Sequence, residues 1–586
     1  MEKINLTING IAVEAIKGET IMKAAERAGI KIPRLCYTEM HNTGVTIKPV
    51  TCRVCEVEIS GGKVMAACVA PVKEGLEVHT NSKLALEARR GRLEAILANH
   101  PPDCLTCERN LACELQTLAV EMGIRKIPAA AEDKPKYEID CSNPSLVRDQ
   151  NKCILCRRCD AVCSKVQAVN ALECQGKGAE TMVKTKTGAP LGDTGCVLCG
   201  LCAAVCPTAA IAIKDDTQKA WDALHDPDKY VIVQIAPAVR SGIGQMFGLQ
   251  AGDDSVGRLN AALRRLGFDK VLNTNFAADL TIMEEGTELI KRVTKGGVLP
   301  MITSCCPGWV KFAEHKYPDL LPHLSSCKSP QQMFGAVAKT WLPTKLAIDP
   351  SRIFSVSIMP CTAKKYEAQR EEMAGDIDVV LTTQEIGKMI KEAAIDFVNL
   401  PDEEFDQMMG EESGAGAIFG VTGGVCEAAL RTVYEIVNQK KLENVEFIPL
   451  RGFEGSYIKE ATVDLNVGEG GAPAPVKVAV SHELRNAAKL MEQIRAGESP
   501  YTFIEIMACP GGCVNGGGQP YCASSVDTIN KRSSTLYNSD KHNIIRRSHD
   551  NEEVKKLYDD YLGEPYYGEK AYELLHTKYK SKPVQE

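Results

Sequence analysis

The stretch Cys153-Ile-Leu-Cys-Arg-Arg-Cys-Asp-Ala-Val-Cys163 is repeated in pattern by Cys196-Val-Leu-Cys-Gly-Leu-Cys-Ala-Ala-Val-Cys206, which Pro207 follows. Each run spaces its cysteines as C-x2-C-x2-C-x3-C, the arrangement by which thiolates hold two [4Fe–4S] clusters. In such a pair the fourth cysteine of each run ligates the other cluster. The sequence therefore predicts one cluster on Cys153, Cys156, Cys159 and Cys206, and a second on Cys163, Cys196, Cys199 and Cys202.

Length and composition place these repeats in a large globular chain. The chain has 586 residues, and at roughly 150 residues per domain this suggests about four domains. Hydrophobic residues make up 44% and charged residues 25%, which is ordinary for soluble proteins, and no apolar run approaches the roughly 18 residues of a membrane span. The net charge of −7 gives no reason to expect nucleic acid or an anionic membrane as a partner.

The cysteine content indicates metal centres. The opening Met1-Glu-Lys-Ile-Asn-Leu-Thr-Ile8 lacks the basic start and apolar core of a signal peptide, so a cytoplasmic, reducing location is expected. In such a compartment clustered thiols indicate metal ligands more often than disulfides, and the count of 25 is odd.

A first cysteine region contains Cys36, Cys52, Cys55 and Cys68. It lies among short alternating segments, such as residues 4–8 and 54–59, and an amphipathic helix pattern over residues 20–28. This arrangement resembles a ubiquitin-like (β-grasp) [2Fe–2S] ferredoxin domain, although plant-type relatives place their first two cysteines closer together. A structural zinc is the alternative, because four-cysteine zinc sites also contain C-x2-C pairs.

A second region, Asn99-His-Pro-Pro-Asp-Cys-Leu-Thr-Cys-Glu-Arg-Asn-Leu-Ala-Cys113, offers the ligands His100, Cys104, Cys107 and Cys113. Taken alone it fits a mixed-ligand structural zinc. It resembles the [4Fe–4S] domain with one histidine and three cysteine ligands in the large subunit of respiratory complex I and in large iron hydrogenases. A neutral imidazole removes one negative charge, so a raised cluster potential is expected.

From about residue 226 apolar strands alternate with amphipathic stretches such as residues 255–266 and 284–293, which predicts an α/β domain. Three cysteine motifs occur there without ferredoxin spacing: Thr303-Ser-Cys-Cys-Pro-Gly-Trp309, Met359-Pro-Cys-Thr-Ala-Lys-Lys-Tyr-Glu367 and Met507-Ala-Cys-Pro-Gly-Gly-Cys-Val-Asn-Gly-Gly-Gly-Gln-Pro520. Their order and separations resemble the signature motifs of [FeFe]-hydrogenases. The resemblance covers nearly the whole chain.

This resemblance implies an H-cluster. Its [4Fe–4S] cube would be held by Cys306, Cys361, Cys509 and Cys513, with Cys513 shared with a two-iron subcluster that carries CO, cyanide and an azadithiolate bridge. Family positions that line the cofactor match Ala236, Pro237, Met359, Pro360 and Met507. The two methionines are alternatively ordinary core residues, and Pro237 a buried strand end.

The resemblance also implies a proton route. Cys305 adjoins the ligand Cys306, and two neighbouring thiols cannot easily ligate one cube, so Cys305 is expected to exchange protons with the cofactor amine. By resemblance the route continues through Glu285, Ser325, Glu288 and Arg292, and the two glutamates, three residues apart, can share a helix face.

Two lysines follow Cys361, the second ligand of this domain in the chain. Lys364 matches the family lysine that donates to a cyanide ligand, whereas Lys365 is expected to be a surface charge. Five cysteines stay unassigned, and one of them, Cys426, either lines the pocket or behaves as a small hydrophobe. The five are Cys141, Cys174, Cys327, Cys426 and Cys522.

The predicted architecture is multidomain, combining α+β and α/β parts. The expected order is a β-grasp [2Fe–2S] domain (1–79), a histidine-ligated [4Fe–4S] domain (80–140), a two-[4Fe–4S] ferredoxin domain (141–220), a two-lobed α/β H-cluster domain (226–540) and a C-terminal helical extension (541–586). The cofactors expected are therefore one [2Fe–2S] cluster, three accessory [4Fe–4S] clusters and the H-cluster.

The function implied is 2 H⁺ + 2 e⁻ ⇌ H2. The segment Ser413-Gly-Ala-Gly-Ala-Ile-Phe-Gly420 only approximates a dinucleotide fingerprint, so NAD(P) is expected to bind partner subunits instead. Those partners are flavin/NAD(P)-binding and thioredoxin-like [2Fe–2S] subunits or ferredoxin, and maturation enzymes are implied for cofactor assembly. A monomeric ferredoxin-dependent hydrogenase is the alternative. A complex I-type subunit would leave the last three motifs without purpose. An iron–sulfur assembly or H2-sensing relative should lack part of Cys305, Lys364 and the glutamate pair.

Overall fold

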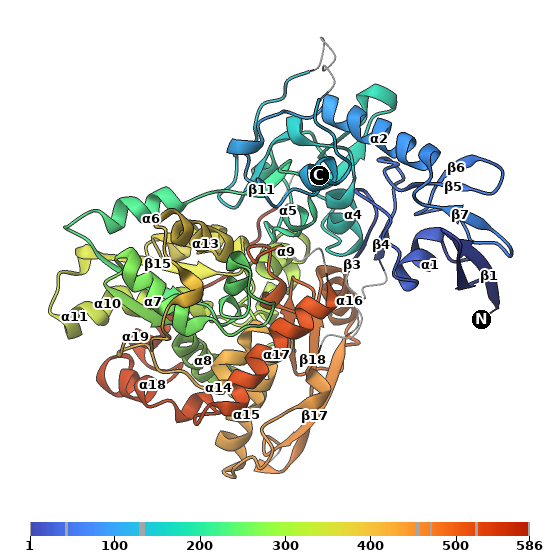
Figure 1. The fold of residues 1–586 in the computed structure, drawn as a ribbon. Helices are drawn as coiled ribbons and strands as arrows, with labels where there is room; N and C mark the ends of the chain where they lie inside the picture. Colours follow the sequence, from blue (N-terminus) through green and yellow to red (C-terminus); the bar gives the residue numbers. More distant parts are fainter. Residues whose placement is uncertain are drawn as a thin grey trace.

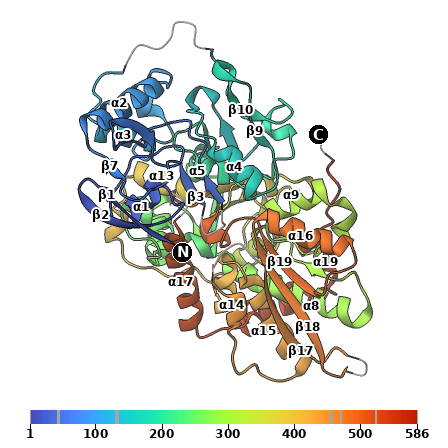
Figure 2. The same ribbon diagram turned by 90° about the vertical axis from the view of Figure 1, so that its right-hand side faces the viewer.

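The computed structural model describes residues 2–40, 45–127, 135–452, 458–468, 471–521 and 525–583. The N-terminal segments, coloured blue to cyan, form one end of the molecule, and the green-to-red remainder forms a larger body beside them (Figure 1). A view turned by 90° shows the same division (Figure 2). None of the described helices has the length and apolar character needed to cross a bilayer.

The first domain is a twisted sheet that covers one helix. Its strand order is β2-β1-β7-β5-β6, and β1 and β7 run parallel while the other pairs are antiparallel. Alternate β1 residues Ile4, Leu6 and Ile8 are buried in one core with Ile21 and Met22 of α1. The elements are β1 Lys3–Ile8, β2 Ile11–Ile16, α1 Ile21–Arg27, β5 Glu56–Ile59, β6 Lys63–Ala66 and β7 Glu77–His79, with a hairpin of β3 Thr38–Met40 and β4 Val45–Ile47.

The next two segments are small and built around cysteine loops. The first contains α2 Lys83–Ala98 and α3 Glu114–Glu121. The second has a near-symmetric core in which α4 Arg158–Lys165 contacts α5 Leu201–Val205, one helix from each cysteine run. Antiparallel pairs close it: β8 Leu146–Arg148 with β11 Ile211–Ile213, and β9 Leu172–Gln175 with β10 Met182–Thr185.

The large body contains two four-stranded sheets. The first is wholly parallel, in the order β13-β12-β15-β16: β12 Tyr230–Ile235, β13 Lys270–Asn273, β15 Ile353–Met359 and β16 Val379–Thr382. The second has the order β14-β19-β18-β17, with only β17 antiparallel: β14 Met301–Ile302, β17 Lys459–Leu465, β18 Ala474–His482 and β19 Phe503–Met507. Since parallel strands share an edge at their carboxyl ends, loops from β15 and β19 are the expected place for a ligand site.

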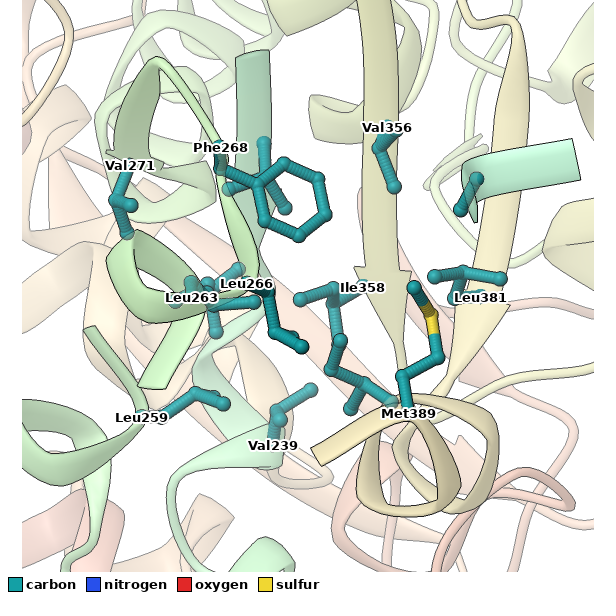
Figure 3. Close-up of a cluster of buried hydrophobic side chains, with 14 of the residues drawn as sticks. Val239, Leu259, Leu263, Leu266, Phe268, Val271, Val356, Ile358, Leu381 and Met389 are labelled. Carbon is teal, nitrogen blue, oxygen red and sulfur yellow. The ribbon is translucent and has the colours of Figure 1, made fainter. Parts of the chain in front are cut away.

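Helices cover these sheets and bury an apolar core. Leu259, Leu263 and Leu266 lie on one face of α7 and pack toward Ile358 of β15 and Met389 of α13 (Figure 3). The helices are α6 Thr217–Leu224, α7 Val256–Leu266, α8 Thr274–Lys295, α9 Pro307–Lys316, α10 Pro330–Thr340, α11 Leu342–Leu346, α12 Ala363–Glu367, α13 Thr383–Glu392, α14 Gly414–Ala417, α15 Gly424–Asn438 and α16 Leu484–Arg495.

The C-terminal segment returns to the middle of the large body. It comprises α17 Val526–His542, α18 Glu552–Leu557, a π-helix Tyr558–Leu562 and α19 Glu569–Leu575. Leu557 and Leu575 share a buried core with Phe276 of α8 and Met333 of α10. Helix α17 crosses the boundary expected at residue 541, and the residues after α19 lie against residues 326–328.

Candidate active site and electron route

A buried cavity of about 80 Å³ lies where loops from the two sheets of the large body meet. Four sulfur ligands predicted from the sequence line it together: Cys306, Cys361, Cys509 and Cys513. Cys306 caps α9, Cys361 follows β15, and the other two follow β19. These thiols come from three distant segments, so the fold brings them together as no local loop could.

Two glycines let the backbone close around this cavity. A Cβ atom on Gly516 would lie 2.1 Å from the backbone oxygen of Pro360. Gly512 has a φ of +95°, and a Cβ there would lie 2.5 Å from the backbone nitrogen of Thr422. Both positions require glycine. Four soft thiolate donors in a tight glycine-lined cradle fit an iron–sulfur cube.

The predicted lining residues surround the same cavity. Ala236 and Pro237 lie just after β12, and Met359 and Pro360 close β15. Met507, the last residue of β19, also lines the wall. Cys426 is fully buried but is not among the residues that line the cavity, and it packs in the adjoining apolar core.

Cys305 and Lys364 also line the cavity, and both are placed for polar roles. Burial, and next the charge of Glu285, raises the pKa of the Cys305 thiol well above its ordinary value. The Lys364 ammonium donates to Glu367 Oε2 at 2.7 Å and to the Cys305 carbonyl oxygen at 3.1 Å. Burial alone would lower the pKa of Lys364, but the Glu367 carboxylate outweighs it, and the net pKa is raised. Cys305 is therefore a neutral thiol, and it lies beside the Lys364 ammonium, which stays protonated.

The predicted relay residues form a connected series on and beside α8. Glu285 is buried, its Oε2 has no hydrogen-bond partner, and the neighbouring Ser325 side chain partly offsets the rise in its pKa. Ser325 Oγ donates to Glu288 Oε2 at 3.0 Å, and Arg292 Nη2 donates to Glu288 Oε1 at 2.6 Å. Burial, with the neighbouring Glu288 charge, raises the pKa of Glu285 to about 8. A carboxyl that titrates near neutrality is suited to proton transfer.

Lys365 contradicts the expectation of a surface charge. Its side chain is only 2% exposed, and its ammonium donates to Asp216 Oδ2 and Glu385 Oε1, both at 2.7 Å. It also donates to the Lys214 carbonyl at 2.8 Å. The expectation was wrong because Asp216 and Glu385, far away in sequence, close over the outer face of the short helix α12.

The repeated cysteine runs form two separate pockets of about 20 Å³ each. One is lined by Cys153, Cys156, Cys159 and Cys206 and the other by Cys163, Cys196, Cys199 and Cys202. The fourth cysteine of each run thus lies with the first three of the other run, as the spacing predicts.

The two N-terminal cysteine regions both adjoin the first of these pockets. Cys36 and Cys52 have sulfurs 3.3 Å apart, with Cys55 and Cys68 in the same buried region, and neighbouring Thr51 donates to the Leu155 carbonyl at 2.9 Å. In the second region His100 follows α2, Cys104 is exposed, and Cys107 and Cys113 are half-buried. Cys113 Sγ lies 3.5 Å from the Pro207 carbonyl oxygen. Both regions therefore contact loops that carry ligands of one cluster pocket.

The second cluster pocket adjoins the catalytic cavity. Thr362, next to Cys361, donates to the Leu198 carbonyl at 2.7 Å. A Cβ on Gly517 would lie 2.5 Å from the Cys199 backbone oxygen. The contacts order the sites as two N-terminal regions, a first pocket, a second pocket and the cavity.

Several buried polar residues at the site were missed by sequence reasoning. Glu367 partners Lys364, and Glu505 accepts backbone N–H groups of Gly423 and Cys426 at 2.7 and 2.8 Å. Burial raises the pKa of Glu505 to about 7. A lone glutamate inside the apolar run Phe503–Met507 was the available signal. Of the unassigned cysteines, Cys327 is buried, Cys174 half-buried and Cys141 exposed, and Cys522 lies outside the described residues.

Family models match four parts of the chain. Residues 229–517 match the iron only hydrogenase large subunit, C-terminal domain, and residues 526–582 match the iron hydrogenase small subunit. Residues 1–83 match a 2Fe-2S iron-sulfur cluster binding domain, and residues 89–128 match the NADH-ubiquinone oxidoreductase-G iron-sulfur binding region.

Individual relatives extend over the whole chain. The NADP-reducing hydrogenase subunit HndD of Solidesulfovibrio fructosivorans is 45% identical over 99% of both chains. Iron hydrogenase 1 of Clostridium pasteurianum is 42% identical over 98% of this chain and 99% of its own. A solved [FeFe]-hydrogenase HydA1 from Chlamydomonas reinhardtii is 43% identical with a TM-score of 0.56, and the match covers 63% of this chain and 99% of that one.

Proposed function

Because this chain belongs to the iron-only hydrogenase family and is an [FeFe]-hydrogenase catalytic subunit, we propose a specific division of its reaction among its residues. The reaction is 2 H⁺ + 2 e⁻ ⇌ H2. The observation that carries the proposal is one enclosed cavity lined by four cysteines from three segments, with a fifth cysteine and a buried lysine on its wall. From the sequence, an assembly or sensory relative was expected to lack part of Cys305, Lys364 and the glutamate pair, and all of these are present in this chain.

The four cavity cysteines Cys306, Cys361, Cys509 and Cys513 would hold the [4Fe–4S] cube of the H-cluster, and by resemblance Cys513 would be the thiolate shared with the two-iron subcluster. When bound, the H-cluster would supply redox-active iron. Lys364 keeps a positive charge on the cavity wall, where it would stabilise anionic ligands of the cofactor, and Met359 and Met507 line the wall with side chains that carry no acidic proton.

Protons travel between the cavity and the surface along the residues beside α8. Cys305 exchanges a proton with the part of the cavity that would hold the cofactor. Glu285 lies on the side of the Cys305 thiol away from the cavity, and it takes up that proton. Ser325 then passes it to Glu288 by giving up its own hydroxyl proton as it receives another. Arg292, the most exposed member, holds Glu288 in place at the outer end. Burial raises the pKa of Glu285 to about 8, so its carboxyl can both take up and release a proton near neutral pH.

The residues of four regions would hold accessory clusters that supply a path for electrons. The N-terminal region would hold a [2Fe–2S] cluster, the His100 region a histidine-ligated [4Fe–4S] cluster, and the two repeat pockets a [4Fe–4S] cluster each. The support is the contact of both N-terminal regions with the first pocket and of the second pocket with the cavity. Two entry points thus converge on one route.

The physiological electron carrier is NAD(P), reached through partner subunits. The support is the full-length likeness to a protein named as a subunit of an NADP-reducing hydrogenase. A self-sufficient ferredoxin-dependent enzyme is the second candidate, favoured by the full-length likeness to Iron hydrogenase 1. Anaerobic H2 uptake by the purified chain with ferredoxin, and with NADP⁺ plus its co-purified subunits, separates them.

The proton route is tested with a dye assay that bypasses the partner. We compare H2 evolution from reduced methyl viologen by the matured chain, Cys305→Ala and, as matched control, Cys426→Ala, a buried thiol off the cavity wall. We expect loss of roughly 10²–10⁴-fold for Cys305→Ala, the range for a positioned acid–base group. Cys426→Ala should stay near the parent. Retained turnover in Cys305→Ala, with infrared bands of bound CO and cyanide confirming the cofactor, would overturn the route.

A further inference from the structure

A second buried polar network meets the proton route at Glu288. His576, just after α19, places Nδ1 2.8 Å from Ser326 Oγ and Nε2 2.9 Å from Glu284 Oε2. Ser326 Oγ in turn lies 3.1 Å from Glu288 Oε2, the same oxygen that Ser325 contacts. His576 is 6% exposed and Glu284 is fully buried. One imidazole therefore bridges two buried carboxylates of α8, one of which lies in the relay.

Two arrangements of the hydrogen atoms fit the donors and acceptors of this network. Glu284 already accepts from the Tyr558 hydroxyl at 2.5 Å and from the Tyr566 backbone N–H at 2.7 Å, so it serves as an acceptor. His576 Nε2 then donates to Glu284. If Nδ1 is bare, Ser326 donates its hydroxyl hydrogen to Nδ1. If Nδ1 carries a proton, His576 donates to Ser326, and the Ser326 hydroxyl donates to Glu288. The serine hydroxyl reverses direction with the charge on His576.

We propose that His576 and Ser326 form a side branch of the proton route that stores one proton taken from Glu288. In the transfer the O–H bond on Glu288 breaks and a new O–H bond forms on Ser326. The former Ser326 O–H bond breaks as an N–H bond forms at His576 Nδ1. No electron moves and the total charge is unchanged.

Charges on both sides support the stored state. The carboxylate left on Glu288 accepts two hydrogen bonds from Arg292, at 2.6 and 3.1 Å. The imidazolium faces the Glu284 carboxylate, and a protonated histidine between hydrogen-bonding acceptors keeps both N–H groups satisfied. The titratable or charged groups around the ring, on every element packed against it, are Glu284, Glu288, Lys291, Arg292, Cys327, Tyr558, Tyr566 and Tyr572.

The position of the branch gives it a function. His576 contacts neither the cavity lining nor Glu285, so it acts through Glu288 and is a positioning residue. A stored proton would refill Glu288 without a new proton from bulk water. Because the branch can hold a proton beside Glu288 or return it, it would change how turnover depends on pH. The C-terminal segment, and not the cavity, would set this dependence.

The test measures H2 evolution with reduced methyl viologen from pH 5 to 9 for the matured full chain and its variants. His576→Gln keeps hydrogen bonding but cannot carry the stored proton. We expect it to change the shape of the pH profile and to lower the rate about twofold to tenfold, less than the roughly 10²–10⁴-fold of a directly acting group. His323→Gln is the matched control, because its half-buried ring lies 2.9 Å from the Pro300 carbonyl oxygen and only its backbone carbonyl, which the substitution keeps, contacts Arg292 of the relay.

The branch rests on the proposed relay, so Glu288→Gln is measured in parallel. If Glu288→Gln turns over like the parent, the relay itself is wrong. If Glu288→Gln is inactive while His576→Gln keeps the parent's profile, the branch alone is wrong. A rate loss in His576→Gln that is equal at every pH, with unchanged infrared bands, would show a purely structural role and also overturn the branch.

Discussion

Replacing Lys365 by methionine tests the buried ion cluster that joins the two-cluster domain to the large body. Lys365 is held by Asp216 from the segment after β11 and by Glu385 from α13. Glu385 also accepts the Asp216 backbone N–H at 2.8 Å, so the two acids lie close together. Methionine fills similar volume but leaves two buried carboxylates facing each other without a cation.

The expected cost follows from that burial. Removing one partner of a buried ion pair costs about 3–5 kcal/mol. For a domain of this size about 2–4 °C of melting temperature corresponds to each kcal/mol, so the transition should fall by about 6–20 °C. Adding Glu385→Gln removes one of the stranded charges and keeps the cap of α13, where Glu385 Oε2 accepts from Thr382 N. It should therefore recover part of the loss.

The measurement is anaerobic differential scanning calorimetry of the cluster-loaded chain. Lys388→Met is the matched control, because Lys388 also bridges two acids, Glu108 and Asp215, but its side chain is 34% exposed. An exposed pair of this kind is worth about 0–1 kcal/mol. If Lys365→Met lowers the melting temperature no more than Lys388→Met does, the claim that burial makes this cluster important is wrong.

Three further predictions concern acid stability, the cofactor cradle and proton transfer. Burial alone would raise the pKa of Asp540, but Arg431 and its neighbours hold it at about 2. Since this is below the ordinary value, about 2 kcal/mol of stability is present above pH 4 and is lost as pH falls toward 2, and denaturant titrations of Asp540→Asn should lack that loss. Gly516→Ala should displace Pro360 by steric conflict and lower bound iron per chain, measured by iron analysis; iron equal to the parent would contradict the cradle. Glu285, with its pKa near 8, should be ionised above that pH, so H2 evolution should fall through pH 8, and Glu285→Gln should be slow at every pH; an unchanged Glu285→Gln profile would refute its role.

Sequence spacing predicted which cysteines of the two runs lie together, for a physical reason. Tight C-x2-C loops fix where thiols lie relative to each other, and the crossing of Cys163 and Cys206 follows from the repeat itself. The amphipathic pattern over residues 255–266 was also confirmed as the helix α7. These features depend on local geometry, which the sequence carries directly.

What the sequence could not predict depends on distant partners. Lys364 and Lys365 are adjacent and chemically alike, and only the fold shows that both are buried, toward different acids. His576 meets Glu284 across 292 positions of sequence, and no spacing indicates such a pair. The role of Glu505 was hidden for the same reason, because its backbone donors come from another loop.

Gly517 shows how the domains of this chain constrain one another. Its Cα lies against Gly200 in the loop of the second cluster pocket, which leaves no room for a side chain. The Chlamydomonas enzyme matches only 63% of this chain, so a hydrogenase body also exists without most of the remaining modules. Wherever evolution removes the module carrying Gly200, position 517 is released from this steric demand and is free to diversify. Glycine at position 517 would then indicate that the neighbouring module is retained, and another residue there would indicate that it is lost. This constraint is independent of the catalytic chemistry.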